Sequence, residues 1–437
     1  MDAGRSVRQL LALTAYWLGL QVLWGALTTI VLPVLVERAV GPAIQATALA
    51  LVAGGQAVVA IAVQPVSGAW SDRVSTRFGR RRPWMVAGVA AQLLLLALVL
   101  PNATSLGAIA AAMLLIELAS NTAQGPYQGL LPDLVPRGRR GLASGMLGAA
   151  QLGGQVIGVA LAGLAVAAGR IDVAIGLGAA ALAIGTATTA LGTHEVVGLD
   201  VAGDDGRRLP VERGWRPWAR QLREAGVAAW RPDVLGHRDY LWVLASRLAI
   251  LMATGTLQPF VYYYLKDSLG LGDAAATAVA PIAALVAFVA LAGAIPGGAM
   301  TARLGRVRTV ALSAVLGAVG TAAFAVAPAF WVLFVVAVPF GLALGMFLAA
   351  DWALMADLAP PGESGRYLGL SNTVTALAGL LAVILGGPIA DLVNGLAPGV
   401  GFRAVFLLAA IEFLVGSWCV RHVHERAAGP LPELAVP

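Results

Sequence analysis

The sequence has few of the residues on which soluble enzymes depend. Only 12% of its 437 residues are charged, four are histidines, and the single cysteine, Cys419, has no partner for a disulfide within the chain. It contains no Walker sequence that would hold a nucleotide phosphate, and its histidines lack the spacing of metal ligands. We therefore expect neither an enzyme nor a bound cofactor, and no ATP-driven transport by this chain alone.

The sequence instead has a large excess of apolar residues, which make up 59% of the chain. Segments long enough to cross a bilayer core of about 30 Å recur along the whole length. Twelve are expected, at about residues 10–36, 46–70, 84–101, 106–131, 142–168, 172–192, 239–265, 274–300, 309–327, 331–356, 367–393 and 403–420. The first is too long for a signal-peptide core and lacks a cleavage site, so we expect it to be retained. None alternates like an outer-membrane strand, so the fold class is an all-α, polytopic membrane protein.

A dense basic loop separates the second and third of these segments. Residues 68–83 read GAWSDRVSTRFGRRRP and include five arginines. Because Lys and Arg in short loops resist translocation, we expect this loop to stay in the cytoplasm. With twelve spans, that orientation places both termini and 24 of the 29 basic residues on the cytoplasmic side. The sequence therefore predicts a multi-pass protein of the inner (cytoplasmic) membrane, and its net charge of +6 reflects this topology rather than nucleic-acid binding.

The chain contains an internal repeat at an offset of 224 residues. Residues 129–147 align without gaps to residues 353–371, and farther on Gly163 matches Gly387. Recurrence of Gly-Arg-Pro turns through composition alone is the alternative explanation. Two related halves joined by a long cytoplasmic linker are typical of transporters whose halves enclose a substrate site near the middle of the membrane.

The predicted organisation has four parts. They are an N-terminal six-helix half (1–192), a cytoplasmic linker (193–238), a C-terminal six-helix half (239–420) and a cytoplasmic tail (421–437). Within the linker, the early charged residues indicate a solvated segment. Residues 216–230 fit either a helix at the inner membrane surface or a simple tether.

Three motifs resemble those of a known transporter family. Residues 68–73 read G-x-x-x-D-R, and the same loop continues as GRRRP from Gly79. The other two motifs are ELASNTAQGPYQGLLPDL at 117–134 and GLQVLWGAL at 19–27. Together they resemble the major facilitator superfamily, and within it the sucrose/proton symporters and the related glycoside-pentoside-hexuronide cation symporters.

The resemblance implies the twelve-helix major facilitator fold, in two six-helix halves, and proton-coupled symport of a sugar or glycoside by alternating access. The chain departs from the sucrose carriers in having Glu117 where they usually have Asp and Gln128 where they have a basic residue. These departures bear on sucrose as the substrate more than on transport. Two alternatives stay open, a proton-antiport exporter of an amphiphilic small molecule and a non-transporting membrane assembly factor.

Glu117 is the ionisable residue that we expect deepest within a span. Asn121, Gln124 and Gln128 follow it at spacings of four, three and four, which makes one polar stripe along the helix. A carboxyl group there can be neutral when sealed from water and ionised when wet, as proton coupling requires. We therefore predict that Glu117 carries the coupling proton, with a purely structural helix contact as the alternative.

Three further charged residues, Arg247, Asp351 and Glu412, lie well inside predicted spans rather than at their ends. Arg247 could bind a polar substrate or neutralise Asp351, or it could snorkel to the inner headgroups. Asp351 is the second candidate for proton coupling, against a local contact at the end of its helix. Glu412 lies in the twelfth span, which is peripheral in the superfamily that the chain resembles, so it is not included among the site residues.

The amides and aromatic residues of the spans predict the substrate class. Amides and carboxylates hydrogen-bond hydroxyl groups, and aromatic faces stack on the apolar side of a sugar ring. The predicted substrate-binding residues are Trp17, Gln21, Trp24, Asn121, Gln124, Gln128, Gln151, Gln155, Arg247 and Gln258. Each taken singly could be a packing or interface residue, and only their convergence favours a sugar. The expected partners are a sugar-like small molecule, the proton and the lipid bilayer, for a carrier that functions as a monomer.

Charged loops at the cytoplasmic ends of the spans are predicted to form a gate. Opposite charges at facing helix ends attract, and they meet only when the cytoplasmic side is closed. The predicted gate residues are Gly68, Asp72, Arg73, Gly79, Arg80, Arg81, Asp133, Asp357 and Arg366.

Overall fold

The computed structural model describes residues 3–73, 79, 81–135, 140–193, 237–358 and 364–424. The first half contains α1 (Ala3–Ala26), η1 (Leu27–Val31), α2 (Leu32–Val40), α3 (Gln45–Arg73), α4 (Arg82–Leu98), η2 (Leu100–Asn102), α5 (Leu106–Leu134), α6 (Arg140–Ala167) and α7 (Ile171–Gly192). The second half contains α9 (Arg238–Tyr263), η5 (Tyr264–Ser268), η6 (Gly272–Ala274), α10 (Ala275–Leu304), α11 (Arg306–Val326), α12 (Val332–Leu358), α13 (Ser364–Leu396) and α14 (Gly401–Val420).

In this described part of the chain, twelve helical segments are long and apolar enough to span a membrane. Each coincides with one of the spans predicted from apolar run length, so that prediction is confirmed. The first span is longer than predicted and ends at Val40, because the π-helical turn η1 joins α1 to α2 without a break. A second π-helical turn, η5, extends α9 in the same way.

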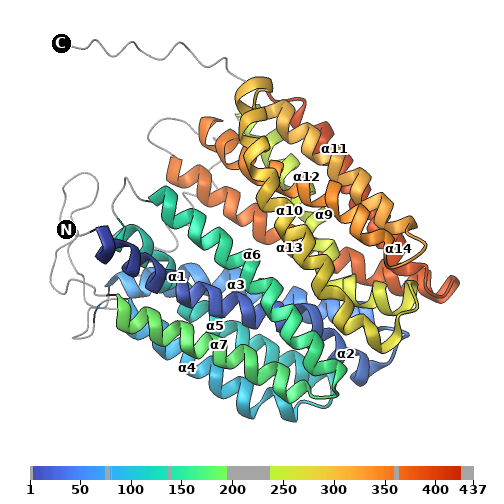
Figure 1. The fold of residues 1–437 in the computed structure, drawn as a ribbon, viewed down its shortest axis with the longest axis horizontal. Helices are drawn as coiled ribbons and strands as arrows, with labels where there is room; N and C mark the ends of the chain where they lie inside the picture. Colours follow the sequence, from blue (N-terminus) through green and yellow to red (C-terminus); the bar gives the residue numbers. More distant parts are fainter. Residues whose placement is uncertain are drawn as a thin grey trace.

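The helices form two groups, which Figure 1 shows as the blue-to-green and yellow-to-red halves. In the first half, α1 packs against α6 and α7, and α5 packs against α3 and α4. In the second half, α12 packs against α10 and α11, and α14 packs against α9 and α11. The main contacts between the halves are those of α3 with α13 and of α6 with α10.

Glycines bring the helices within each half into backbone contact. A Cβ atom at Gly158 of α6 would stand 2.0 Å from the carbonyl oxygen of Val22 on α1. In the second half, a Cβ atom at Gly345 of α12 would stand 2.1 Å from the carbonyl oxygen of Ala290 on α10. Where glycine stands at a helix crossing in a membrane, the two backbones approach closely and gain van der Waals contact. Each half is therefore tightly packed within itself.

The predicted linker and tail lie almost entirely outside the described residues, which exclude 194–236 and 425–437. The division of the chain into halves, linker and tail at the predicted residue numbers therefore stays a prediction.

Because successive spans run in opposite directions, α1 begins and α14 ends at the same end of the bundle. We call the opposite end the distal end. It holds the end of α2, the start of α3, η5 and the end of α13.

Candidate functional site

Glu117 lies on α5 and faces α3, with which α5 packs closely. Its Oε1 atom accepts a hydrogen bond from Asn121 Nδ2 at 2.6 Å, one turn along the same helix. Its Oε2 atom accepts one from Gln56 Nε2 of α3 at 3.3 Å. An ionised carboxylate only accepts hydrogen bonds, so two amide donors on its two oxygens suit the ionised form.

Gln56 was not among the residues predicted from the sequence. It is buried within a span, and a buried amide in apolar surroundings needs a hydrogen-bond partner. The sequence therefore contained a signal for Gln56. Like the carboxyl group of Glu117, though at a lower cost, a single amide group inside an apolar span needs a hydrogen-bond partner.

Ser120, also not predicted, connects the polar stripe of α5 to α1. Its hydroxyl oxygen lies 3.3 Å from Trp24 Nε1 and 3.1 Å from Gln124 Nε2, and both nitrogens donate to it. Two predicted substrate residues from different helices thus meet at one serine. Gln128, the last member of the stripe, lies exposed farther along α5.

The other predicted residues of the first half lie on α1 and α6. Trp17 stacks on Tyr127 of α5 with ring centroids 5.9 Å apart and planes 7° from parallel. Gln155 Nε2 lies 3.4 Å from Gln21 Oε1, which links α6 to α1. Gln151 is exposed on α6, one turn before Gln155.

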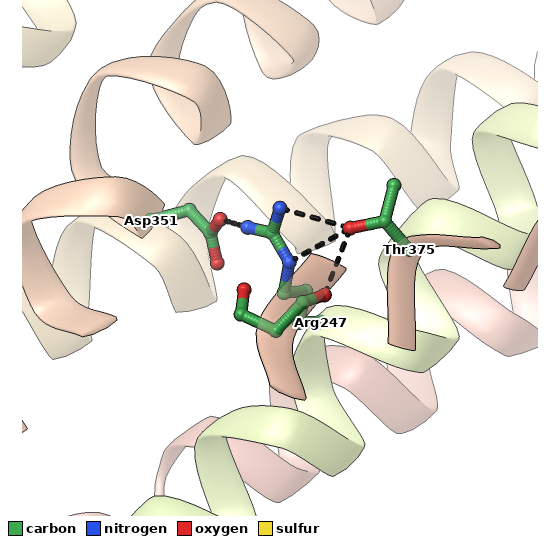
Figure 2. Close-up of polar contacts among 4 residues, drawn as sticks. Arg247, Asp351 and Thr375 are labelled. Atoms are coloured by element: carbon green, nitrogen blue, oxygen red, sulfur yellow. Dashed lines mark hydrogen bonds and ion pairs between the residues drawn. The ribbon is translucent and has the colours of Figure 1, made fainter. Parts of the chain in front are cut away.

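In the second half, Arg247 of α9 and Asp351 of α12 form an ion pair between Nη1 and Oδ2. Thr375 of α13 completes the group, because its hydroxyl oxygen accepts hydrogen bonds from Arg247 Nε at 3.3 Å and from Nη2 at 3.1 Å. Figure 2 shows Arg247 between the other two, with Asp351 on one side of the guanidinium and Thr375 on the other.

The burial of Arg247 decides whether its side chain faces the interior of the bundle or snorkels to the inner headgroups. The exposed fractions of Arg247 and Asp351 are 5% and 3%, and a snorkelling side chain would instead place its guanidinium in water. The expected pairing with Asp351 is therefore present, and snorkelling is wrong. Thr375 was missed, since a threonine in a span gives no charge signal.

Two predicted or considered residues lie away from these two clusters. Gln258 of α9 lies across the interface between the halves, with Nε2 3.5 Å from Thr29 Oγ1 of η1. Glu412 is buried on α14, and within the described part of the chain its Oε2 atom has no hydrogen-bond partner.

Most of the predicted cytoplasmic gate falls outside what the structure describes. Gly79 adopts a φ of +113°, a conformation that suits glycine. Arg81 is buried, and its guanidinium occupies the place that a side chain at Gly129 of α5 would take. The remaining predicted gate residues, which lie outside the described residues or side chains, are Gly68, Asp72, Arg73, Arg80, Asp133, Asp357 and Arg366. The gate therefore stays a prediction.

Sequence comparison relates the chain to transporters. The family profile described as MFS/sugar transport protein matches residues 17–400. The sucrose transport protein SUC4 of Arabidopsis thaliana is 34% identical over 116 residues. That match spans 22% of this chain and 22% of the plant protein, so it covers only about a fifth of either.

Solved structures of similar shape are also transporters. A bacterial homolog of the human lysosomal transporter Spinster, in an inward-facing and unoccupied conformation, has a TM-score of 0.71 and 16% identity, over 97% of this chain and 98% of that chain. The nucleoside transporter NupG has a TM-score of 0.70 and 14% identity, over 94% of this chain and 98% of that chain. At such low identity, these two similarities show the fold alone.

Proposed function

The chain belongs to the MFS/sugar transport protein family of the major facilitator superfamily, and from this premise we propose that it imports a sugar or glycoside together with protons. Its family, its twelve spans and its fold make it a multi-pass membrane transporter. We propose the substrate class, the coupling ion and the direction of transport on the grounds below. We also propose that both termini and the linker lie in the cytoplasm, and hence that the distal end lies outside.

The hydrogen-bonding environment of Glu117 is the main support for proton coupling. Its carboxylate is held by two amides, and among the described residues no ion pair includes it. A carboxylate inside a membrane without a cation beside it can take up a proton when sealed and release it when water enters. Asp351 is the second candidate, but it is already paired with Arg247 and could exchange a proton only after that pair opened.

The hydrogen bonds of Glu117 favour a proton over a metal cation as the coupling ion. Hard cations prefer several oxygen ligands. Both oxygens of Glu117 instead accept N–H groups, from Asn121 and Gln56. A proton needs only one of these oxygens.

A sugar-like substrate is supported by the residues that accompany Glu117. Amides at Gln21, Gln124 and Gln155 and the indole of Trp24 supply hydrogen-bonding groups from three helices of the first half. The Arg247–Asp351 pair supplies charged groups from the second half. Such groups match hydroxyl-rich molecules, including the plant relative's sucrose and the sugar moiety of nucleosides.

Thermal stabilisation of the purified protein by a panel of sugars, glycosides, nucleosides and hydrophobic cations identifies the ligand class. The selected ligand is then offered to proteoliposomes with an imposed inward proton gradient. We expect a sugar-like ligand to accumulate, and accumulation to stop when a protonophore removes the gradient. Uptake that does not depend on the proton gradient would contradict proton coupling. Thermal stabilisation by hydrophobic cations alone would favour the alternative function, a proton-antiport exporter of an amphiphilic small molecule.

A further inference from the structure

The two halves touch at two helix crossings that occupy equivalent places in the internal repeat. A Cβ atom at Gly387 of α13 would lie 2.5 Å from Ala50 Cβ and 2.6 Å from Ala46 O, both on α3. A Cβ atom at Gly163 of α6 would lie 2.3 Å from Ala276 O on α10. Gly163 and Gly387 are separated by the repeat offset of 224 residues. Each crossing therefore brings the backbone of one half against the other half.

The α13–α3 crossing carries an additional polar contact. One turn beyond Gly387, the Asp391 carboxylate accepts the backbone N–H of Ala46 at 3.2 Å and that of Thr47 at 2.6 Å. These amides belong to the first turn of α3, where N–H groups have no partner within the helix and the helix dipole favours negative charge. A carboxylate cap is common at such a position, but this one comes from the opposite half of the molecule.

The equivalent crossing cannot make this contact. The residue that corresponds to Asp391 in the first half is Ala167, at the end of α6, which has no side-chain acceptor. The two crossings thus share their close glycine contact and differ in the carboxylate.

A second contact between the halves holds the start of α3. Gln45 Nε2 donates to Asp267 Oδ2 of η5 at 2.8 Å, so two elements of the second half bind the first three residues of this helix. Nearby, Tyr263 Oη donates to the carbonyl oxygen of Pro33 at 2.8 Å. The distal end is therefore closed, with the first turn of α3 at the centre of the contacts.

We propose that Asp391 is the latch of the distal gate, holding the first turn of α3 while that side is closed and releasing it when the halves separate. On opening, the freed carboxylate and amides lie at a helix end at the edge of the bundle, where water can replace both partners. The latch therefore biases the gate towards the closed state without locking it. This inference rests on the proposed function only in requiring that the halves move by alternating access.

Spin labels across the distal end test the latch without substrate or transport. Thr104 and Trp331 are exposed near the distal ends of opposite halves, and both are replaced by cysteine. The buried Cys419, the sole native cysteine, is replaced by serine. Pulsed electron-spin resonance then gives the distance distribution between the labels in nanodiscs.

We expect Asp391→Asn to raise the ratio of long to short distances about tenfold, since it removes the charge from two hydrogen bonds. Gly387→Ala should act in the same direction, because its Cβ atom collides with α3. The matched controls are Asp172→Asn, whose partner Arg170 lies in the same half, and Gly395→Ala on α13, whose added Cβ atom meets nothing within 4 Å.

Unchanged distances in Asp391→Asn would overturn the latch whatever Gly387→Ala does, as would an equal shift in the controls. Because the labels report conformation alone, failure to find a transported sugar would leave this result standing. The two failures are therefore distinguishable.

Discussion

The two halves of this molecule hold their intramembrane charge in opposite ways. In the first half, the Glu117 carboxylate accepts hydrogen bonds from the side-chain amides of Asn121 and Gln56. In the second half, Asp351 is neutralised by Arg247. The difference shows that a shared scaffold does not impose shared electrostatics, because a few side chains decide where a buried carboxyl group is held by amides and where it is paired with a cation.

The internal repeat makes this contrast specific. At the repeat offset, Arg247 and Asp351 correspond to Leu23 and Tyr127, and Glu117 corresponds to Gly341. Neither charged arrangement therefore has a counterpart in the other half. We interpret the first half as the site of proton exchange and the second half as the site of a fixed polar contact.

Breaking the pair in the second half should have the largest effect on stability. Arg247→Gln or Asp351→Asn leaves one buried charge without its partner, which typically costs about 3–5 kcal/mol. The double variant removes both charges, so it should be more stable than either single variant. Thermal unfolding of the three variants provides the measurement, analysed as a double-mutant cycle. Strictly additive losses would show that the two residues do not act as a pair.

Removing the amide of Gln56 should have a smaller effect, confined to the first half. Gln56→Met leaves one oxygen of Glu117 without its donor, and a hydrogen bond to a charged group is worth about 1.5–3 kcal/mol. We expect gradient-driven uptake to fall about tenfold while the protein remains folded. Gln64→Met on the same helix is the control, since Gln64 is not among the hydrogen-bond partners of Glu117 in the described structure. Equal losses in the two variants would remove Gln56 from the site.

The sequence predicted features that the membrane itself enforces. A span must be apolar over its whole length, so run length alone located the twelve spans found in the described residues. A lone charge inside a bilayer is costly, so Arg247 and Asp351 could be expected to meet. Both conclusions required no knowledge of how the helices pack.

The sequence did not predict the uncharged and end-of-helix partners. Ser120 and Thr375 have hydroxyl groups, which often satisfy their hydrogen bonds within their own helix, and Gln56 has an amide without charge. Which of them meets a charged or aromatic neighbour depends on the rotation of each helix, which is set by packing contacts such as those of Gly158. Asp391 was missed because an acid at the end of a span resembles a surface residue.

Glu117 is the residue that we propose to exchange the coupling proton. Glu117→Gln keeps much of the shape of the protonated acid but cannot release a proton. Steps that need only the protonated carrier should therefore persist, whereas steps that need deprotonation should stop.

The decisive measurement compares two activities of Glu117→Gln in proteoliposomes, exchange of labelled for unlabelled substrate and accumulation driven by a pH gradient. We expect exchange to continue at close to the normal rate and accumulation to disappear. Accumulation at close to the normal level would contradict proton exchange at Glu117, leaving this residue a structural contact between α5 and α3 and directing attention to Asp351.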